Sequence, residues 1–346
     1  MLVGATALCG RWPTALAAPV EENRAKALAV FGKYAETQQK LRSYRYVLES
    51  TTETQARLTE EPYKAMSGNS RSHQRTECRT DGQRFSVRFR TWGNVKSASD
   101  FLSEARCPYN SVLWDGKTFF NYVATTDTPG RLSIYTQTDA AWRLRMRKQM
   151  DNPLWCHWTA SEPFGPAASL SLRTNLEPAG QAQCLVIDAT APGGKYTAWL
   201  DPERGHNIAK ATISYSRSGI GYSLDRVVCK EIAGVWVPVE GYSEKRQTFA
   251  KGDYTNEVEH LKVTDIALTP DHAALRSFVP DDIKNGAWVT INPVLHQPFN
   301  PRNLPLWQDG RVVDRAGKVI LTPSPRLIEQ RGTPGGHSAP TLPLPN

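Results

Sequence analysis

The sequence lacks the residue spacings on which most metal sites and activated nucleophiles depend. Its seven histidines include no H-E-x-x-H or H-x-H pair, and its six cysteines include no C-x-x-C pair. The glycine-bearing stretch "SRSGIGYS" matches neither G-x-S-x-G nor a P-loop. There is also no run of about 20 apolar residues that would cross a bilayer as a helix. We therefore expect no metal, no cofactor, no transmembrane segment and no enzymatic activity.

Two groups of residues are candidates for sites of chemistry. Cys156 and His157 are a thiol and a base, but neighbours in a chain point in different directions, and a catalytic pair is normally distant in sequence. The second group gathers carboxylates and an imidazole on one predicted strand, as expected of a solvated strand face: Glu257, Glu259, His260 and Asp265. An enzyme with dispersed catalytic residues stays open as the less favoured alternative.

The charge pattern by itself excludes few classes of binding partner. The chain has 42 basic and 34 acidic residues, a formal charge of +8, and no long block of either sign. Such mild basicity fits anionic membrane surfaces, acidic lipids, nucleic acid or plain solubility. Arg84, Arg88 and Arg90 lie near Trp92, but no nucleic-acid recognition motif accompanies them, so we expect no nucleic-acid partner.

The first 18 residues resemble a signal peptide. A short apolar stretch precedes Ala15-Leu16-Ala17, which resembles a signal-peptidase site, although Arg11 interrupts the stretch and no basic residue comes before it. We expect export to the periplasm or elsewhere in the cell envelope. Beyond this segment five cysteines remain, at positions 78, 107, 156, 184 and 229. In an oxidising compartment we expect at least one pair close enough for a disulfide, and buried thiols are the alternative.

The residues that are present predict a β-rich fold with one opening helix. Apolar residues recur at helical spacing between 21 and 42, after which Tyr44, Tyr46 and Leu48 alternate with polar residues. Asp81-Gly82, Asp115-Gly116 and the Pro202 to Gly205 turn join strands into hairpins. We predict an α+β protein, mainly β, in which one curved antiparallel sheet or unclosed barrel wraps round one or two helices and holds most of residues 43–268, with the opening helix on its concave side.

The remaining segments suggest the domain limits. Residues 139–172 contain a weak helix pattern followed by a Pro-rich aromatic stretch, which we interpret as an insertion or lid loop. From residue 293 onward prolines accumulate around one small predicted hairpin, "WQDGRVVDRAGKVI", and the end has the composition of a disordered tail. We therefore predict a signal peptide (1–18), one sheet domain (19–292) and a Pro-rich extension (293–346).

Several segments resemble one family. The opening helix followed by "SYRYVLES", "RTDGQRFSVRF", "LWDGKTFFNY" and "YTAWLDPERG" is similar to the outer-membrane lipoprotein-sorting carriers, the LolA/LolB-like group. The resemblance is greatest to the long exported versions of planctomycete-type bacteria, and it covers residues 21–286. It implies an unclosed β-barrel wrapped round helices, with an apolar cavity that receives acyl chains.

These observations lead to one functional expectation. We expect a non-catalytic carrier that binds a hydrophobic ligand, namely a lipid or lipoprotein acyl chain, with an envelope protein and peripheral membrane contact as further candidate partners. The expected apolar wall consists of side chains on three neighbouring strands: Phe85, Val87, Phe89, Trp114, Phe120 and Tyr122. The alternative is a structural or sensory envelope module whose barrel is filled, in which case these six residues are ordinary core.

Overall fold

The computed structural model describes most of the predicted sheet domain. The described residues are 18–61, 63–93, 107–125, 128–136, 154, 169–215, 219–292 and 303–323. The predicted signal peptide up to residue 17, most of the predicted lid loop (including Cys156 and His157), and the tail from residue 324 lie outside them.

One helix opens the described chain. Helix α1 (Ala18–Lys40) has Glu21 in its first turn and Lys40 in its last, as the helix dipole favours. The predicted helix is confirmed, and one stripe of it is buried against the sheet. Ala27, Phe31 and Tyr34 are buried, whereas Leu28 is 49% exposed. The stripe is set by the i, i+4, i+7 spacing of the residues that meet the sheet.

Within the described ranges, eighteen strands form one sheet. The first six are β1 (Tyr44–Arg57), β2 (Gly68–Thr80), β3 (Phe85–Gly93), β4 (Tyr109–Trp114), β5 (Phe119–Ala124) and β6 (Arg131–Tyr135). The next eight are β7 (Ser169–Leu172), β8 (Glu177–Ala179), β9 (Ala182–Ala191), β10 (Gly194–Asp201), β11 (Asn207–Tyr215), β12 (Ile220–Ile232), β13 (Val235–Thr248) and β14 (Tyr254–Leu268). The last four are β15 (Trp288–Ile291), β16 (Leu306–Gln308), β17 (Arg311–Val313) and β18 (Val319–Leu321). Short 3₁₀ turns occur at Tyr63–Met66, Pro202–Arg204 and Ala250–Gly252.

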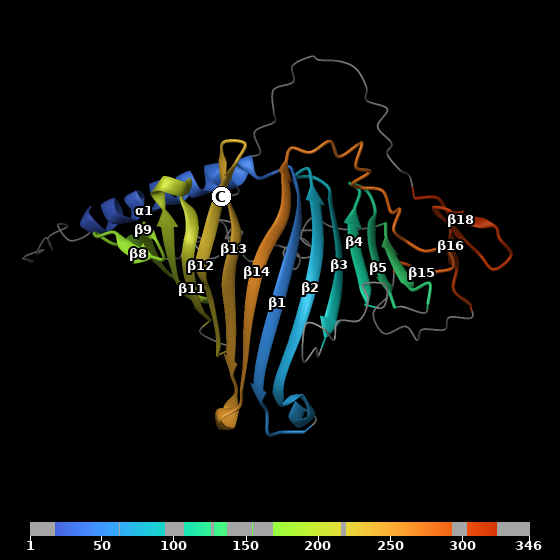
Figure 1. Ribbon diagram of the computed structural model, residues 1–346, viewed down its shortest axis with the longest axis horizontal. Coiled ribbons are helices and arrows are strands. Elements are labelled where there is room, and N and C mark those ends of the chain that lie inside the picture. Colours follow the sequence, from blue (N-terminus) through green and yellow to red (C-terminus); the bar gives the residue numbers. More distant parts are fainter. Residues whose placement is uncertain are drawn as a thin grey trace, which may run out of the picture.

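The strand order places β14, the last strand of the region 43–268, next to β1, its first strand. β7 and β8 both pair with β9, and β9 to β14 follow as a meander. β14 then pairs with β1, which continues through β2 to β6. Every strand pairing among the described residues of 43–268 is antiparallel, as predicted. The sheet is curved and unclosed (Figure 1).

The far end of the sheet departs from this rule. β15 pairs with β6 in parallel, and β16 to β18 extend the sheet from it. The predicted C-terminal hairpin is therefore confirmed, but the parallel strand before it was not predicted. Figure 1 shows α1 across the end of the sheet that holds β8 to β13, and β15, β16 and β18 at the opposite end.

The predicted turns form, and the Asp and Gly residues in them stabilise their backbone. Asp201 caps the short 3₁₀ turn by accepting hydrogen bonds from the backbone N–H groups of Glu203 and Arg204, and Gly205 closes the turn with a φ of 69°. Oδ1 of Asp81 likewise accepts from the backbone N–H of Arg84 at 2.6 Å. These aspartates satisfy turn amides that have no partner in a strand.

Apolar side chains pack on both faces of the sheet, over many strands on the inner face and over β4 to β6 on the outer face. The inner face, on which α1 packs, carries a large core that joins the buried helix residues to side chains such as Tyr46, Trp114 and Leu261. On the outer face of β4 to β6, a second core joins Leu113, Phe120 and Tyr122 to residues of the 278–312 region. The C-terminal part of the described chain therefore packs on the back of the sheet.

Candidate ligand-binding site

Four of the six predicted wall residues share the inner face. Phe85 pairs with Trp114 across β3 and β4, and both belong to the inner core with Val87, while Phe89 packs at its margin. Phe85, Val87 and Trp114 are 7%, 3% and 6% exposed. These three side chains are therefore packed core in the described structure.

The other two predicted residues lie on the opposite face, so the expectation of one continuous wall is wrong. Trp114 pairs with Phe119 across the β4–β5 hairpin, which places Phe119 on the inner face. Successive side chains of a strand point to opposite faces, so Phe120 and Tyr122 belong to the outer core. Phe119 is thus the inner-face neighbour that the prediction assigned to Phe120.

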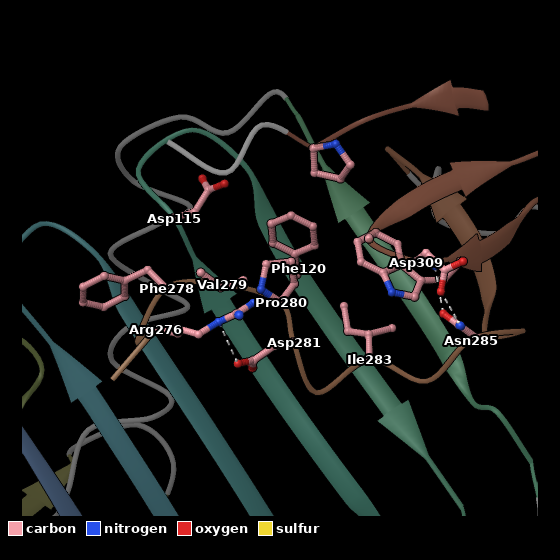
Figure 2. Close-up of a pocket in the computed structure, with 13 residues that line it drawn as sticks. Asp115, Phe120, Arg276, Phe278, Val279, Pro280, Asp281, Ile283, Asn285 and Asp309 are labelled. Atoms are coloured by element: carbon pink, nitrogen blue, oxygen red, sulfur yellow. Dashed lines mark hydrogen bonds and ion pairs between the residues drawn. The ribbon is translucent and has the colours of Figure 1, made fainter. Parts of the chain in front are cut away.

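A cavity of about 350 Å³ lies on the outer face, between the sheet and the C-terminal segment (Figure 2). Its lining combines residues of the β4–β5 hairpin with residues 276–285 and 307–323: Asp115, Phe120, Arg276, Phe278, Val279, Pro280, Asp281, Ile283, Asn285, Trp307, Asp309, Gly310 and Pro323. Of the six predicted residues only Phe120 lines it. This volume falls within the range of small-molecule sites, about 300–1,000 Å³.

The floor of this cavity is aromatic and aliphatic. Phe120 meets Trp307 edge to face, with ring centroids 6.4 Å apart. Both are almost fully buried, and Phe278 and Ile283 are each 8% exposed. The guanidinium carbon of Arg84 lies 4.3 Å from the centroid of the Phe278 ring and holds that ring from the sheet side.

The rim is polar and carries both signs of charge. Figure 2 shows Phe120 and Ile283 between two polar pairs: Arg276 Nε lies 3.7 Å from Asp281 Oδ2, and Asn285 Nδ2 donates to Asp309 Oδ1 at 2.8 Å. Asp115 lies at another edge of the cavity, and burial raises the pKa of its carboxyl above the usual range. Such a site suits an amphipathic ligand with an apolar body and a small polar group.

An imidazole between two hydroxyl groups lies next to this cavity. His272 Nε2 lies 3.1 Å from Ser43 Oγ, and its Nδ1 lies 3.0 Å from Ser277 Oγ. A catalytic serine needs exposure and a base oriented by a carboxylate. Ser277 is completely buried and the imidazole contacts hydroxyls on both sides, so this chain of contacts ties the start of β1 to the 271–280 turn.

Strand alternation separates His260 from Glu259 in the predicted cluster of carboxylates and imidazole on β14. His260 lies on the outer face, stacked on Tyr242 and 2.9 Å from Glu240 Oε1, whereas Glu259 lies on the inner face beside Ser243. Within the described ranges, no group of three or more His, Cys, Asp or Glu side chains is placed to hold a metal ion.

Four of the five cysteines beyond residue 18 are described, and no disulfide joins any two of them: Cys78, Cys107, Cys184 and Cys229. Burial raises the pKa of Cys184 to about 11 and that of Cys229 to about 12. Cys78, Cys107 and Cys184 are buried, as the buried-thiol alternative expects, whereas Cys229 is half-buried, and pairing with Cys156 lies outside the described residues.

The sequence patterns did not indicate the C-terminal half of this site. The resemblance to the lipoprotein-sorting carriers extends to residue 286 and so includes Phe278 and Ile283, but it assigned no role to them. One signal for it was present in the sequence. The apolar residues Phe278, Ile283 and Val289 are followed by Trp307 within the Pro-rich region, and such residues are unusual in a disordered extension.

Comparison with known proteins gives matches in structure and none in sequence. No protein-family model and no curated protein matches the chain. Similar solved structures include a DUF1329 family protein from Desulfovibrio piger, which is 10% identical, matches 71% of this chain and 94% of its own, and has a TM-score of 0.40.

Two further structures are similar. A LolA superfamily protein from Nitrosomonas europaea is 13% identical over 70% of this chain and 94% of its own, with a TM-score of 0.35. MucB, in a complex with MucA(peri), is 11% identical over 72% of this chain and 96% of its own, with a TM-score of 0.22. The Nitrosomonas europaea protein carries the superfamily name that the sequence resemblance suggested. These scores, all below 0.5, assign no function to the chain.

One general property bears on membrane contact. Within the described residues, no helix has the length and hydrophobicity that spanning a bilayer requires.

Proposed function

We propose that this protein is a non-catalytic binding protein for an amphipathic ligand with an apolar body, such as an acyl chain. The observation that carries the proposal is the outer-face cavity of about 350 Å³, with an apolar floor and a polar rim. Ligand sites in proteins commonly combine a mostly apolar concavity with a few convergent polar groups. The proposal retains the expected class of ligand but moves its site from the inner to the outer face.

The chemistry of the cavity supports binding without catalysis. Its titratable residues are Asp115, Arg276, Asp281 and Asp309, and three of them are already engaged: Arg276 with Asp281, and Asp309 with Asn285. None of the lining residues is a histidine, cysteine, serine or lysine that would serve as a nucleophile or base.

A specific observation favours a second candidate function. The inner face is packed, with Phe85, Val87 and Trp114 all less than 9% exposed. A filled inner face is what a structural or sensory envelope module would have. In that reading the protein acts through its surfaces, and the outer cavity holds no ligand. Export to the cell envelope belongs to both proposals and would be tested by fractionating cells that express the full chain.

The test is a displacement titration with a fluorescent fatty acid on delipidated full-length protein. Val279 lines the cavity and is only half-buried, so Val279→Asp introduces a carboxylate there with little cost to the core. An ionised carboxylate facing an acyl chain loses hydration without a partner, at a cost of about 2 kcal/mol or more. We expect at least tenfold weaker binding. Val319→Asp is the matched control, since Val319 is 44% exposed and lies outside the cavity lining.

Phe89→Asp separates the two faces, because Phe89 packs at the margin of the inner core. Loss of binding in Phe89→Asp, with Val279→Asp unaffected, would return the ligand to the inner face and overturn the outer site. Wild-type protein without saturable binding would overturn the carrier proposal and leave the structural module. Circular dichroism of every variant checks that it is folded.

A further inference from the structure

The rim of the outer-face cavity holds a guanidinium group that makes no hydrogen bond within the described part of the chain. The side chain of Arg276 is 66% exposed, and its charged contact joins Nε to Asp281 Oδ2 at 3.7 Å. At this distance the two groups attract each other without a hydrogen bond, and exposed pairs of this kind contribute little to stability. The N–H donors of Arg276 therefore remain available to a ligand.

The backbone at Arg276 is fixed, so its side chain leaves the rim from a defined point. Its N–H donates to the carbonyl oxygen of Ala273 at 3.0 Å, and its own carbonyl oxygen accepts from the N–H of Val279 at 3.2 Å. The residue has a φ of 48°, in the left-handed region. Because these bonds involve only the backbone, the charge of the side chain can be changed while the turn is kept.

The carboxylate in contact with Arg276 has a stronger partner elsewhere. Asp281 Oδ1 accepts a hydrogen bond from Arg88 Nη2 at 2.6 Å, and charge-assisted bonds of this length are strong. Asp282, the other carboxylate beside Arg88, accepts a hydrogen bond from Tyr109 and does not line the cavity. Asp281 therefore stays bound to Arg88 when a ligand engages Arg276.

The other two carboxylates of the lining are also held by the protein. Asp115 Oδ1 accepts from the backbone N–H of Lys117 at 2.7 Å, and the positive charge of the same residue acts on it. Asp309 Oδ1 accepts from Asn285 Nδ2 at 2.8 Å, and Arg311 supplies a positive charge nearby. Each carboxylate of the lining thus has a cation outside the lining, which leaves the charge of Arg276 for the ligand.

We propose that Arg276 binds the anionic head group of the ligand. This inference rests on the proposed carrier function and specifies the ligand as an anionic single-chain amphiphile. A guanidinium fork matches the oxygens of a carboxylate or a phosphate in pairs. In Figure 2, Arg276 lies on one side of Phe120 and Ile283, and Asp309 lies on the other. The chain of a ligand held at Arg276 would therefore cross the apolar floor.

The experiment varies the head group at constant chain length. Delipidated full-length protein is titrated by calorimetry, at low ionic strength, with decanoate, decyl phosphate, decanol and decylamine. The test variant is Arg276→Gln, and Arg276→Lys keeps the charge but removes the fork. The matched control is Arg311→Gln, which removes an exposed guanidinium group close to the cavity but outside its lining.

We expect the wild type to bind decanoate or decyl phosphate at least tenfold more tightly than decanol, and to bind decylamine most weakly. Arg276→Gln should lose this preference but bind decanol with wild-type affinity, and Arg276→Lys should keep part of the preference. Arg311→Gln should behave as the wild type. The preference should also decrease in about 0.15 M salt, where exposed charges are screened.

The outcomes separate the head group from the carrier proposal. Equal affinity of the wild type for all four compounds, or a preference for decylamine, would overturn the anionic head group and leave the carrier proposal standing. Protein that binds none of the four would overturn both. Equal losses of preference in Arg276→Gln and Arg311→Gln would overturn the assignment to Arg276. The tighter binder of decanoate and decyl phosphate distinguishes a carboxylate from a phosphate head group.

Discussion

Arg88 on β3 donates a 2.6 Å hydrogen bond to Asp281, a residue 193 positions later in the chain. With the Tyr109–Asp282 bond, it fastens the 278–285 segment onto the outer face. Phe278, Val279 and Ile283 of that segment line the apolar cavity. Two polar contacts between distant parts of the sequence therefore help to form the wall of the candidate site.

We predict that Asp281→Ala/Asp282→Ala loosens this segment. The substitution leaves the guanidinium of Arg88, which is 19% exposed, without its carboxylates, so we expect a loss of about 2–3 kcal/mol in the free energy of unfolding. Urea denaturation measures it, and limited proteolysis should cut within 271–285. Lys251→Ala, which removes a pair exposed to solvent, should cost less than about 1 kcal/mol. Equal stability losses in both variants would contradict the prediction.

Phe119 and Phe120 offer a test of the two faces, because they are neighbours in sequence and lie in different cores. Phe119→Leu and Phe120→Leu should each destabilise the protein by about 1–1.5 kcal/mol. Only Phe120→Leu should change the affinity for the fluorescent fatty acid, since Phe120 lines the cavity. A change confined to Phe119→Leu would instead point to the inner face.

Gly194 is predicted to tolerate no side chain. A Cβ at this position would lie 2.2 Å from the carbonyl oxygen of Ser214, on the paired strand β11. Gly194→Ala should therefore destabilise the protein by at least about 3 kcal/mol or prevent folding. Gly180→Ala is the control, with open space around its Cβ and a φ of 62°, and should cost only about 1–2 kcal/mol. Thermal unfolding monitored by circular dichroism compares them.

Glu259 should make stability depend on pH. Burial on the inner face raises the pKa of its carboxyl, and hydrogen bonds from Ser50 and Ser243 offset this only in part. The folded state then binds the proton more tightly than the unfolded chain does, so this group's contribution to stability falls as pH rises from the unfolded pKa through the folded one. Glu259→Gln should remove that loss. Urea denaturation at pH 4, 5.5 and 7 should show that the free energy of unfolding of Glu259→Gln increases relative to that of the wild type as pH rises. A difference in free energy that stays constant over these pH values would refute the prediction.

The thiols of Cys184 and Cys229 should react slowly with alkylating reagents. With pKa values of about 11 for Cys184 and about 12 for Cys229, the thiolate fraction at pH 8 is about 100-fold or more below that of an ordinary thiol. Alkylation by iodoacetamide, followed by peptide mass spectrometry, should modify both residues at correspondingly low rates in the folded protein and at ordinary rates in urea. Fast modification of the folded protein would show that these side chains are accessible.

The sequence by itself determined the local features of this protein. Turn residues such as Asp81-Gly82 and the Pro202 to Gly205 stretch specify their own backbone geometry, and the alternation of Tyr44, Tyr46 and Leu48 specifies which side of β1 is buried. A hairpin fixes its two strands as antiparallel neighbours, so the long antiparallel sheet followed from the serial turns. The helical spacing of apolar residues between 21 and 42 likewise predicted helix α1.

Only the tertiary structure decided where the candidate site lies. The pairing of Trp114 with Phe119 depends on the register of the β4–β5 hairpin, and a shift of one residue exchanges the faces of every side chain on a strand. The parallel pairing of β15 with β6, and the contacts of Arg88 and Phe120 with Asp281 and Trp307, join residues more than 150 positions apart. No local periodicity encodes such contacts, because they depend on how two already formed surfaces fit together.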